Sequence, residues 1–170
     1  MWANRGQSRP DFAIEPGPGQ ESVWDYPRPP AIEPDGRRVI VKAGDAVLAD
    51  TTRAIRILET ASPPGYYIPP EDVRQELLRP ESGQTFCEWK GVASYWSVTA
   101  EEERGPVAWS YTAPNATYAQ IERYFSFYPG RVECYVGKER VRTQPGGFYG
   151  GWVTDEIVGP WKGEPGTGGW

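Results

Sequence analysis

The sequence contains no histidine, and this absence excludes several kinds of active site. Ser-His-Asp triads and Cys-His pairs both need imidazole as the base, so one copy of this chain cannot build either. Metal sites that rely on imidazole are excluded too, and the two cysteines cannot complete a tetrahedral zinc site by themselves. We therefore assign no metal ligands and leave the cofactor open, and carboxylates remain available for Mg²⁺ or Ca²⁺.

Two further absences limit the classes of partner. The formal net charge is −5 with a pI near 4.9, so the chain lacks the excess of basic residues that is typical of nucleic-acid-binding proteins. No apolar run approaches the ~18 residues of a membrane-spanning helix, and residues 1–30 hold charges and prolines in place of a signal-peptide core. We expect a cytoplasmic protein that binds neither nucleic acid nor membrane and keeps its cysteines reduced.

Aromatic residues, glycine and proline are abundant. The chain has 8 Trp, 10 Tyr, 20 Gly and 18 Pro among its 170 residues. Large aromatic side chains fill cores, and their polar edges also suit the wall of a pocket. Frequent glycine and proline favour short strands and tight turns over long helices, and the length fits one domain with a substantial core.

Composition divides the chain into three parts. Residues 1–36 form a Pro/Gly-rich arm, residues 37–143 a β-rich core domain, and residues 144–170 a Gly/aromatic tail. We expect the arm to be extended, and we expect the tail to wrap the core because a disordered segment seldom carries so many tryptophans.

Alternating side chains predict a mainly β domain built from antiparallel strands. Two segments are expected to be short helices, residues 69–78, where proline and acidic residues suit a helix start, and residues 118–125. The expected strands cover residues 38–42, 46–50, 54–59, 84–88, 91–99, 107–112, 131–136 and 139–142.

Glu59 stands at the end of one of these strands. It shares a face with Ile55 and Ile57, so if the isoleucines point inward the carboxylate must be paired or line a cavity. Two interpretations remain open for Glu59. It is either a general base or cation ligand, or the partner of Lys90 or an arginine in a structural ion pair.

A turn is expected at residues 88–90, directly after Cys87 and ending at Lys90. The turn would bring the thiol next to the ammonium, which lowers a thiol pKa and favours a nucleophile, whereas the alternative is a buried core cysteine. Lys90 is a candidate for binding phosphate or carboxylate or for forming a Schiff base, and the alternative is a surface lysine lying over Trp89.

Four aromatic residues are candidates for the wall of a pocket that stacks a planar ligand, with plain core packing as the alternative. These residues are Tyr67, Trp96, Trp109 and Tyr128.

Several uncommon runs of residues recur through the core from Val39 to Val141. They are Glu59-Thr60, Tyr67-Ile68-Pro69, Asp72-Val73, residues 85–91, Ala93-Ser94-Tyr95, Trp109-Ser110-Tyr111 and Phe127-Tyr128. With these runs the core resembles the domain of unknown function 427 family, and the tail is similar to that of a longer bacterial variant.

The resemblance implies a compact antiparallel domain shaped as a flattened barrel or tent, and family collections attach a nucleotidyltransferase label. Such transfer commonly uses paired carboxylates with Mg²⁺ and a triphosphate loop. This chain has no Asp-Xaa-Asp or Gly-Ser sequence.

Three functions remain open. The first is binding of a small planar or anionic ligand in an aromatic pocket anchored by Lys90 and Glu59. The second is an enzyme acting on nucleotides or related metabolites through Cys87, Lys90 or Glu59 without histidine. The third is a protein-interaction module, for example a homodimer formed through the arm or tail. The first two require the side chains of Glu59, Cys87 and Lys90 to converge.

Overall fold

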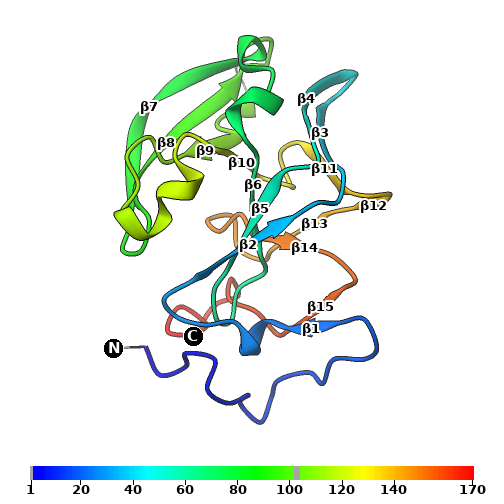
Figure 1. Ribbon diagram of the computed structural model, residues 1–170, viewed down its shortest axis with the longest axis vertical. Helices are drawn as coiled ribbons and strands as arrows, with labels where there is room; N and C mark the ends of the chain where they lie inside the picture. Colours follow the sequence, from blue (N-terminus) through cyan, green and yellow to red (C-terminus); the bar gives the residue numbers. More distant parts are fainter. Residues whose placement is uncertain (1, 102–103) are drawn as a thin grey trace.

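β-Strands dominate the computed structural model, which describes residues 2–101 and 104–170 (Figure 1). The prediction of a mainly β protein is therefore confirmed. In chain order the strands are β1 (Glu21–Ser22), β2 (Ala31–Asp35), β3 (Val39–Ala43), β4 (Ala46–Thr51), β5 (Ala54–Leu58), β6 (Gly65–Tyr67), β7 (Leu78–Cys87), β8 (Gly91–Val98), β9 (Ala108–Ser110), β10 (Phe125–Phe127), β11 (Glu133–Val136), β12 (Glu139–Arg140), β13 (Arg142–Thr143), β14 (Trp152–Val153) and β15 (Ile157–Val158).

The strands form several separate sheets rather than a barrel. Three antiparallel sheets have the strand orders β10-β9-β8-β7, β12-β11-β3-β4 and β2-β5-β6, and the pairs β13-β14 and β1-β15 are added at the tail. None of the sheets in the described part of the chain closes on itself, so of the two expected forms, a flattened barrel or a tent of antiparallel sheets, the barrel is wrong. Closure needs matched strands at both edges of a sheet, whereas β12 has two residues and β10 has three.

The two expected helices are short 3₁₀ turns. Residues 69–78 contain the turns Pro70–Asp72 and Gln75–Leu77, because the segment between them bonds to a strand. The Arg74 N–H donates to the Leu48 carbonyl at 2.8 Å, and Val73 forms a β-bridge with Ala49. In the second segment the turn Ala116–Ile121 is interrupted at Tyr118, whose hydroxyl donates to the Pro30 carbonyl at 2.9 Å.

Strand β7 starts earlier than expected. The sequence predicted a strand over residues 84–88, yet β7 begins at Leu78 and passes through Pro80. A register shift between Pro80 and Gln84 accommodates the proline and Gly83, and β7 lies at a sheet edge where a missing N–H costs little. Because proline usually ends an element, the sequence pattern placed this boundary too late.

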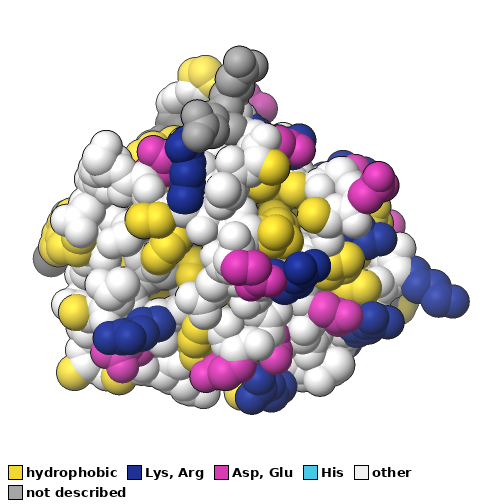
Figure 2. Space-filling view, turned by 90° about the horizontal axis from the view of Figure 1, so that it is seen from above, with side chains coloured by type: hydrophobic (Ala, Val, Ile, Leu, Met, Phe, Trp, Pro, Cys, Tyr) yellow, Lys and Arg dark blue, Asp and Glu magenta, His cyan; other side chains and the backbone are white. Residues whose placement is uncertain are grey.

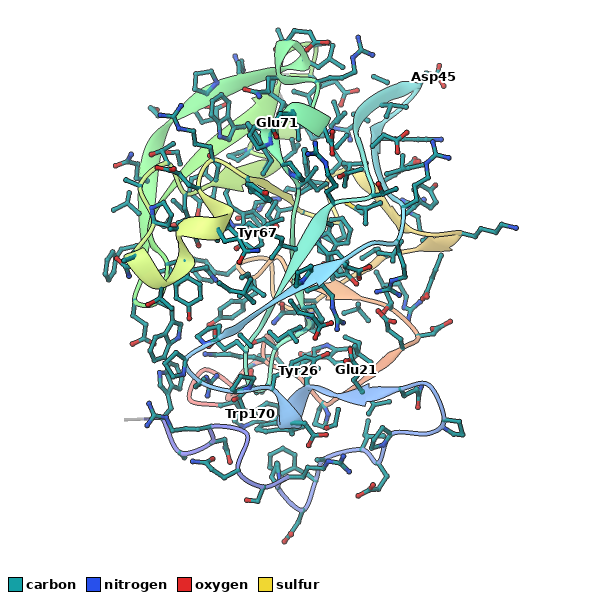
Figure 3. All side chains as sticks on the ribbon, viewed as in Figure 1. Glu21, Tyr26, Asp45, Tyr67, Glu71 and Trp170 are labelled. Atoms are coloured by element: carbon teal, nitrogen blue, oxygen red, sulfur yellow. The ribbon has the colours of Figure 1, made fainter. Side chains whose placement is uncertain are left out.

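The tail packs into the core through Trp152. Its ring stacks on Tyr66 with centroids 4.6 Å apart, and its Nε1 donates to the Phe127 carbonyl at 2.9 Å. The arm and the tail then meet, since β1 pairs in parallel with β15 and both chain ends lie at the same end of the molecule (Figure 1). Trp170 lies at this end of the molecule (Figure 3), and its ring stacks on that of Phe12 of the arm with 5.1 Å between the centroids.

Candidate functional site

A pocket of about 340 Å³ opens between the β5–β6 region, the β7–β8 turn and the tail. Its volume falls in the lower part of the range for small-molecule sites, which runs from roughly 300 to 1,000 Å³. The expected site residues that line it are Glu59, Tyr67, Cys87, Lys90, Trp109 and Tyr128.

The turn between β7 and β8 brings Cys87 and Lys90 to the pocket. Cys87 pairs with Gly91 at the end of the hairpin, and Gly91 has a φ of 105°, which a residue with a side chain rarely adopts. Asn115 holds the turn from outside, because its N–H donates to the Lys90 carbonyl at 3.0 Å and its Nδ2 to the Trp89 carbonyl at 2.6 Å. Cys87 and Lys90 thus line the same pocket from the two sides of a tight turn that Gly91 permits.

Glu59 pairs with an arginine of the arm. Its carboxylate accepts a hydrogen bond from Arg28 Nε at 3.1 Å, and the Arg28 side chain is fully buried. Arg28 also donates to the carbonyl groups of Thr60 and Trp170, at 3.0 and 2.7 Å. Glu59 therefore both lines the pocket and takes part in a structural ion pair, and its partner is Arg28 rather than Lys90.

Lys90 carries a positive charge into the pocket without a counterion. Within residues 2–101 and 104–170 no carboxylate forms an ion pair with it, and its Nζ lies 5.7 Å from the ring centroid of Tyr111. Burial lowers the pKa of the Lys90 ammonium, but Tyr67, Cys87 and Glu59 together raise the pKa above its usual value.

Tyrosine and tryptophan rings form another part of the pocket wall. Trp109 meets Tyr67 edge to face at 6.3 Å and packs on Tyr128 at 4.6 Å, while its Nε1 donates to the Tyr67 hydroxyl at 3.3 Å. Tyr67 lies near the middle of the molecule (Figure 3). Burial raises the pKa values of Tyr111 and Tyr128, which keeps both phenols neutral. These rings belong to a buried cluster and also border the pocket.

Trp96 lies outside the pocket. Its ring packs against Phe125 at 5.3 Å, and its Nε1 donates to the Ser110 hydroxyl at 3.0 Å. Successive side chains of a strand point to opposite faces, so the neighbouring Tyr95 lines the pocket in its place. The alternation along β8 was visible in the sequence, but it did not show which face bordered the cavity.

A match to a known protein family shows what this chain is related to. Residues 31–138 match the family described as Domain of unknown function (DUF427), labelled NTP_transf_9. The chain belongs to the DUF427 family. No curated protein matches the chain.

Part of the pocket wall comes from outside the DUF427 match. The N-terminal arm supplies Trp2, and the tail supplies Gln144, residues 148–151 and Lys162. Sequence reasoning missed these residues, because only the path of the arm and tail over the domain brings them to the pocket. The one available signal was a lysine among the glycines and tryptophans of the tail.

Lys162 is the most unusual of these added residues. Its exposed fraction is 6%, and its Nζ lies 4.4 Å from the Trp2 ring centroid and 5.4 Å from that of Tyr149. Burial, and then the charge of Arg28, lower the pKa of Lys162. The fold thus holds an ammonium group in an unfavourable place beside the pocket.

Three further findings concern the described residues. They contain no group of three or more His, Cys, Asp or Glu side chains placed to hold a metal ion. None of their helices is long and apolar enough to cross a membrane. On the face shown in Figure 2, basic and acidic side chains lie interspersed, without a continuous basic stripe.

Proposed function

We propose that this DUF427 protein binds a small planar anion in the pocket, with Lys90 as the group that holds the negative charge. The observation that carries the proposal is the ammonium of half-buried Lys90, which lines the pocket beside aromatic rings and has no ion pair among the described residues. A charge that is partly removed from water without a partner is costly, so a ligand that supplies the partner gains affinity from the site.

The charge balance of the pocket favours an anion over a cation. The negative charge of Glu59 is already matched by Arg28 at 3.1 Å. Glu88 is exposed and accepts a hydrogen bond from Trp2 Nε1 at 2.9 Å. Lys90 and Lys162 remain as positive charges without an ion pair among the described residues.

The shape of the pocket favours a planar ligand. Aromatic rings stack on flat ligands with little loss of conformational entropy, because each side chain has only two rotatable bonds. Trp109 and Tyr128 present such rings, and the volume of about 340 Å³ suits a ligand of one or two rings. Aromatic carboxylates and aryl phosphates combine both features.

A thermal-shift series tests this proposal. Benzoate and phenyl phosphate are compared with their neutral analogues benzamide and phenol, and with the non-aromatic anions acetate and inorganic phosphate. We expect the aromatic anions to raise the unfolding temperature of wild type most, since ~100-fold excess over Kd adds about 2.7 kcal/mol of stability.

Two lysine variants identify the group responsible. Lys90→Met should lose the response to aromatic anions. Lys42→Met is the matched control, because Lys42 also lies over a tyrosine ring, 5.9 Å from the centroid of Tyr135, but does not line the pocket. Equal responses of Lys90→Met and Lys42→Met would overturn the assignment of Lys90, and no response of wild type to any aromatic anion would overturn the proposed ligand class.

A second candidate function is catalysis by the Cys87 thiol, because this thiol borders the same pocket as Lys90. Cys134 is a built-in reference, since it is fully buried and burial raises the pKa of its thiol. A catalytic thiol would be alkylated by iodoacetamide at pH 6 much faster in wild type than in Lys90→Met. Equal alkylation rates of Cys87 in the two proteins would rule out activation by Lys90.

A further inference from the structure

Lys162 has a fixed position that a surface lysine would not have. Its N–H donates to the Ala61 carbonyl at 2.8 Å, and its carbonyl accepts from Gln144 Nε2 at 2.6 Å. Its ammonium lies near two rings, 4.4 Å from the centroid of Trp2 and 5.4 Å from that of Tyr149. Both the backbone and the side chain are thus held where the residue borders the pocket.

The acidic groups near Lys162 are engaged elsewhere. Glu59 and Glu88 are the carboxylates whose charges raise the pKa of Lys162, against the stronger lowering by burial and Arg28. Glu59 is bound to Arg28, and Glu88 accepts from Trp2. In the described part of the chain, Lys162 therefore has no ion pair of its own although its exposed fraction is only 6%.

We propose that Lys162 is a second anion-binding residue of the pocket, and that the ligand is a planar dianion whose charges are shared between Lys90 and Lys162. This inference rests on the proposed function. It makes the tail a specificity element, because Lys162 lies outside the segment that matches the DUF427 family. A ligand with one negative charge leaves one of the two ammonium groups unpaired, which disfavours it relative to a dianion.

Calorimetric titration with matched probes tests the inference on the full chain. Phenyl phosphate carries two charges at pH 8, whereas phenyl sulfate has a similar shape and carries one. Terephthalate and benzoate form a second pair, in which the two charges stand at opposite ends of one ring. Phenyl phosphate thus tests a ligand with both charges on one group, and terephthalate tests a ligand with one charge on each of two groups.

We expect wild type to bind at least one divalent probe about 10-fold or more tighter than its monovalent partner. Lys162→Met should abolish this preference while still binding the monovalent probe, and Lys162→Arg should retain the preference. Lys90→Met should weaken both members of each pair. Circular dichroism and the unfolding temperature establish that each variant is folded, and Lys162→Gln serves as a second neutral variant if Lys162→Met does not fold.

Different results would overturn the role of Lys162 and the proposed function. A preference for divalent probes that survives in Lys162→Met and Lys162→Gln, or an equal loss of affinity for both members of a pair, would overturn the role of Lys162 alone. Affinities that do not change in Lys90→Met, or wild type that binds none of the four probes, would overturn the proposed function and the inference with it.

Discussion

Two regions of this protein differ in whether the positive charges that they remove from water have an acidic partner. In the Arg56 cluster, where the arm and tail meet the core, the Arg56 guanidinium lies 2.7 Å from Glu21 and 2.5 Å from Glu33. Glu156 of the tail and Asp35 lie close by, at 3.9 and 4.0 Å. In the pocket, the described residues provide no ion pair for Lys90 or Lys162.

The difference indicates what each region is for. Charges that satisfy one another fix segments together, and the Arg56 cluster joins the arm, the core and the tail. Charges held without partners reduce stability, so their retention is expected where a ligand supplies the partner. Natural proteins commonly give up stability at binding sites in this way.

Arg56→Met should have the largest effect on stability. The side chain of Arg56 is 5% exposed, and removing it leaves Glu21 and Glu33 without an ion pair among the described residues, whereas Asp35 and Glu156 keep theirs with Arg37. We expect the free energy of unfolding in urea at pH 7 to fall by about 3 kcal/mol, as is typical for a broken buried pair.

The control for Arg56→Met is Arg38→Met. Arg38 pairs with Asp50 at 2.8 Å, but both side chains are largely exposed, and such pairs contribute little. The urea midpoint of Arg38→Met should match that of wild type. If Arg56→Met also matched wild type, the Arg56 cluster would not be what joins the arm and tail to the core.

The pH dependence of stability should show a smaller effect at the same cluster, through Glu21, the partner of Arg56. Burial acts to raise the pKa of Glu21, but the hydrogen bonds and charge of Arg56 outweigh it and lower the pKa below its usual value. A carboxylate with a lowered pKa stabilises the fold above its unfolded-state pKa, and this contribution is lost as the pH falls through the folded-state pKa.

Glu21→Gln lacks this contribution at every pH. We therefore expect Glu21→Gln to be less stable than wild type at pH 7, and the two unfolding curves to converge as the pH falls below the usual glutamate range. Parallel curves from pH 7 into acid would show that Glu21 does not stabilise the protein through its charge.

Lys162→Met should have the smallest effect and the opposite sign. Burial, and then Arg28, lower the pKa of Lys162, which means that the fold disfavours its charged form. Replacing the ammonium by an apolar side chain of similar length should raise the free energy of unfolding by up to about 1 kcal/mol. A clear loss of stability in urea unfolding would mean that Lys162 has a structural role.

The sequence predicted the family region and part of the pocket wall for identifiable reasons. It indicated a turn at residues 88–90, and Cys87 and Lys90 at this turn both line the cavity. The strand pattern placed Glu59 at the inner end of a row, where it pairs with Arg28 and borders the pocket. Local periodicity was enough for these features, because each depends on neighbours within one strand or one hairpin.

The remaining features depend on contacts between distant segments. Trp2 and Lys162 meet at 4.4 Å although they lie near opposite ends of the chain, and no local pattern could have joined them. The expected helix at residues 69–78 failed for a related reason, since bonds to β4 replaced those of a helix. The expected barrel failed because its closure depends on the lengths of edge strands, and a sequence pattern defines these boundaries poorly.

The most direct test of whether the Lys90 charge is held for a ligand is to measure both the affinity for phenyl phosphate and the stability of wild type and Lys90→Met in one buffer. We predict that Lys90→Met stays as stable as wild type within about 1 kcal/mol and binds phenyl phosphate about 10-fold or more weakly. Equal affinity in the two proteins, or a large loss of stability in Lys90→Met, would contradict the claim that this charge is held for a ligand.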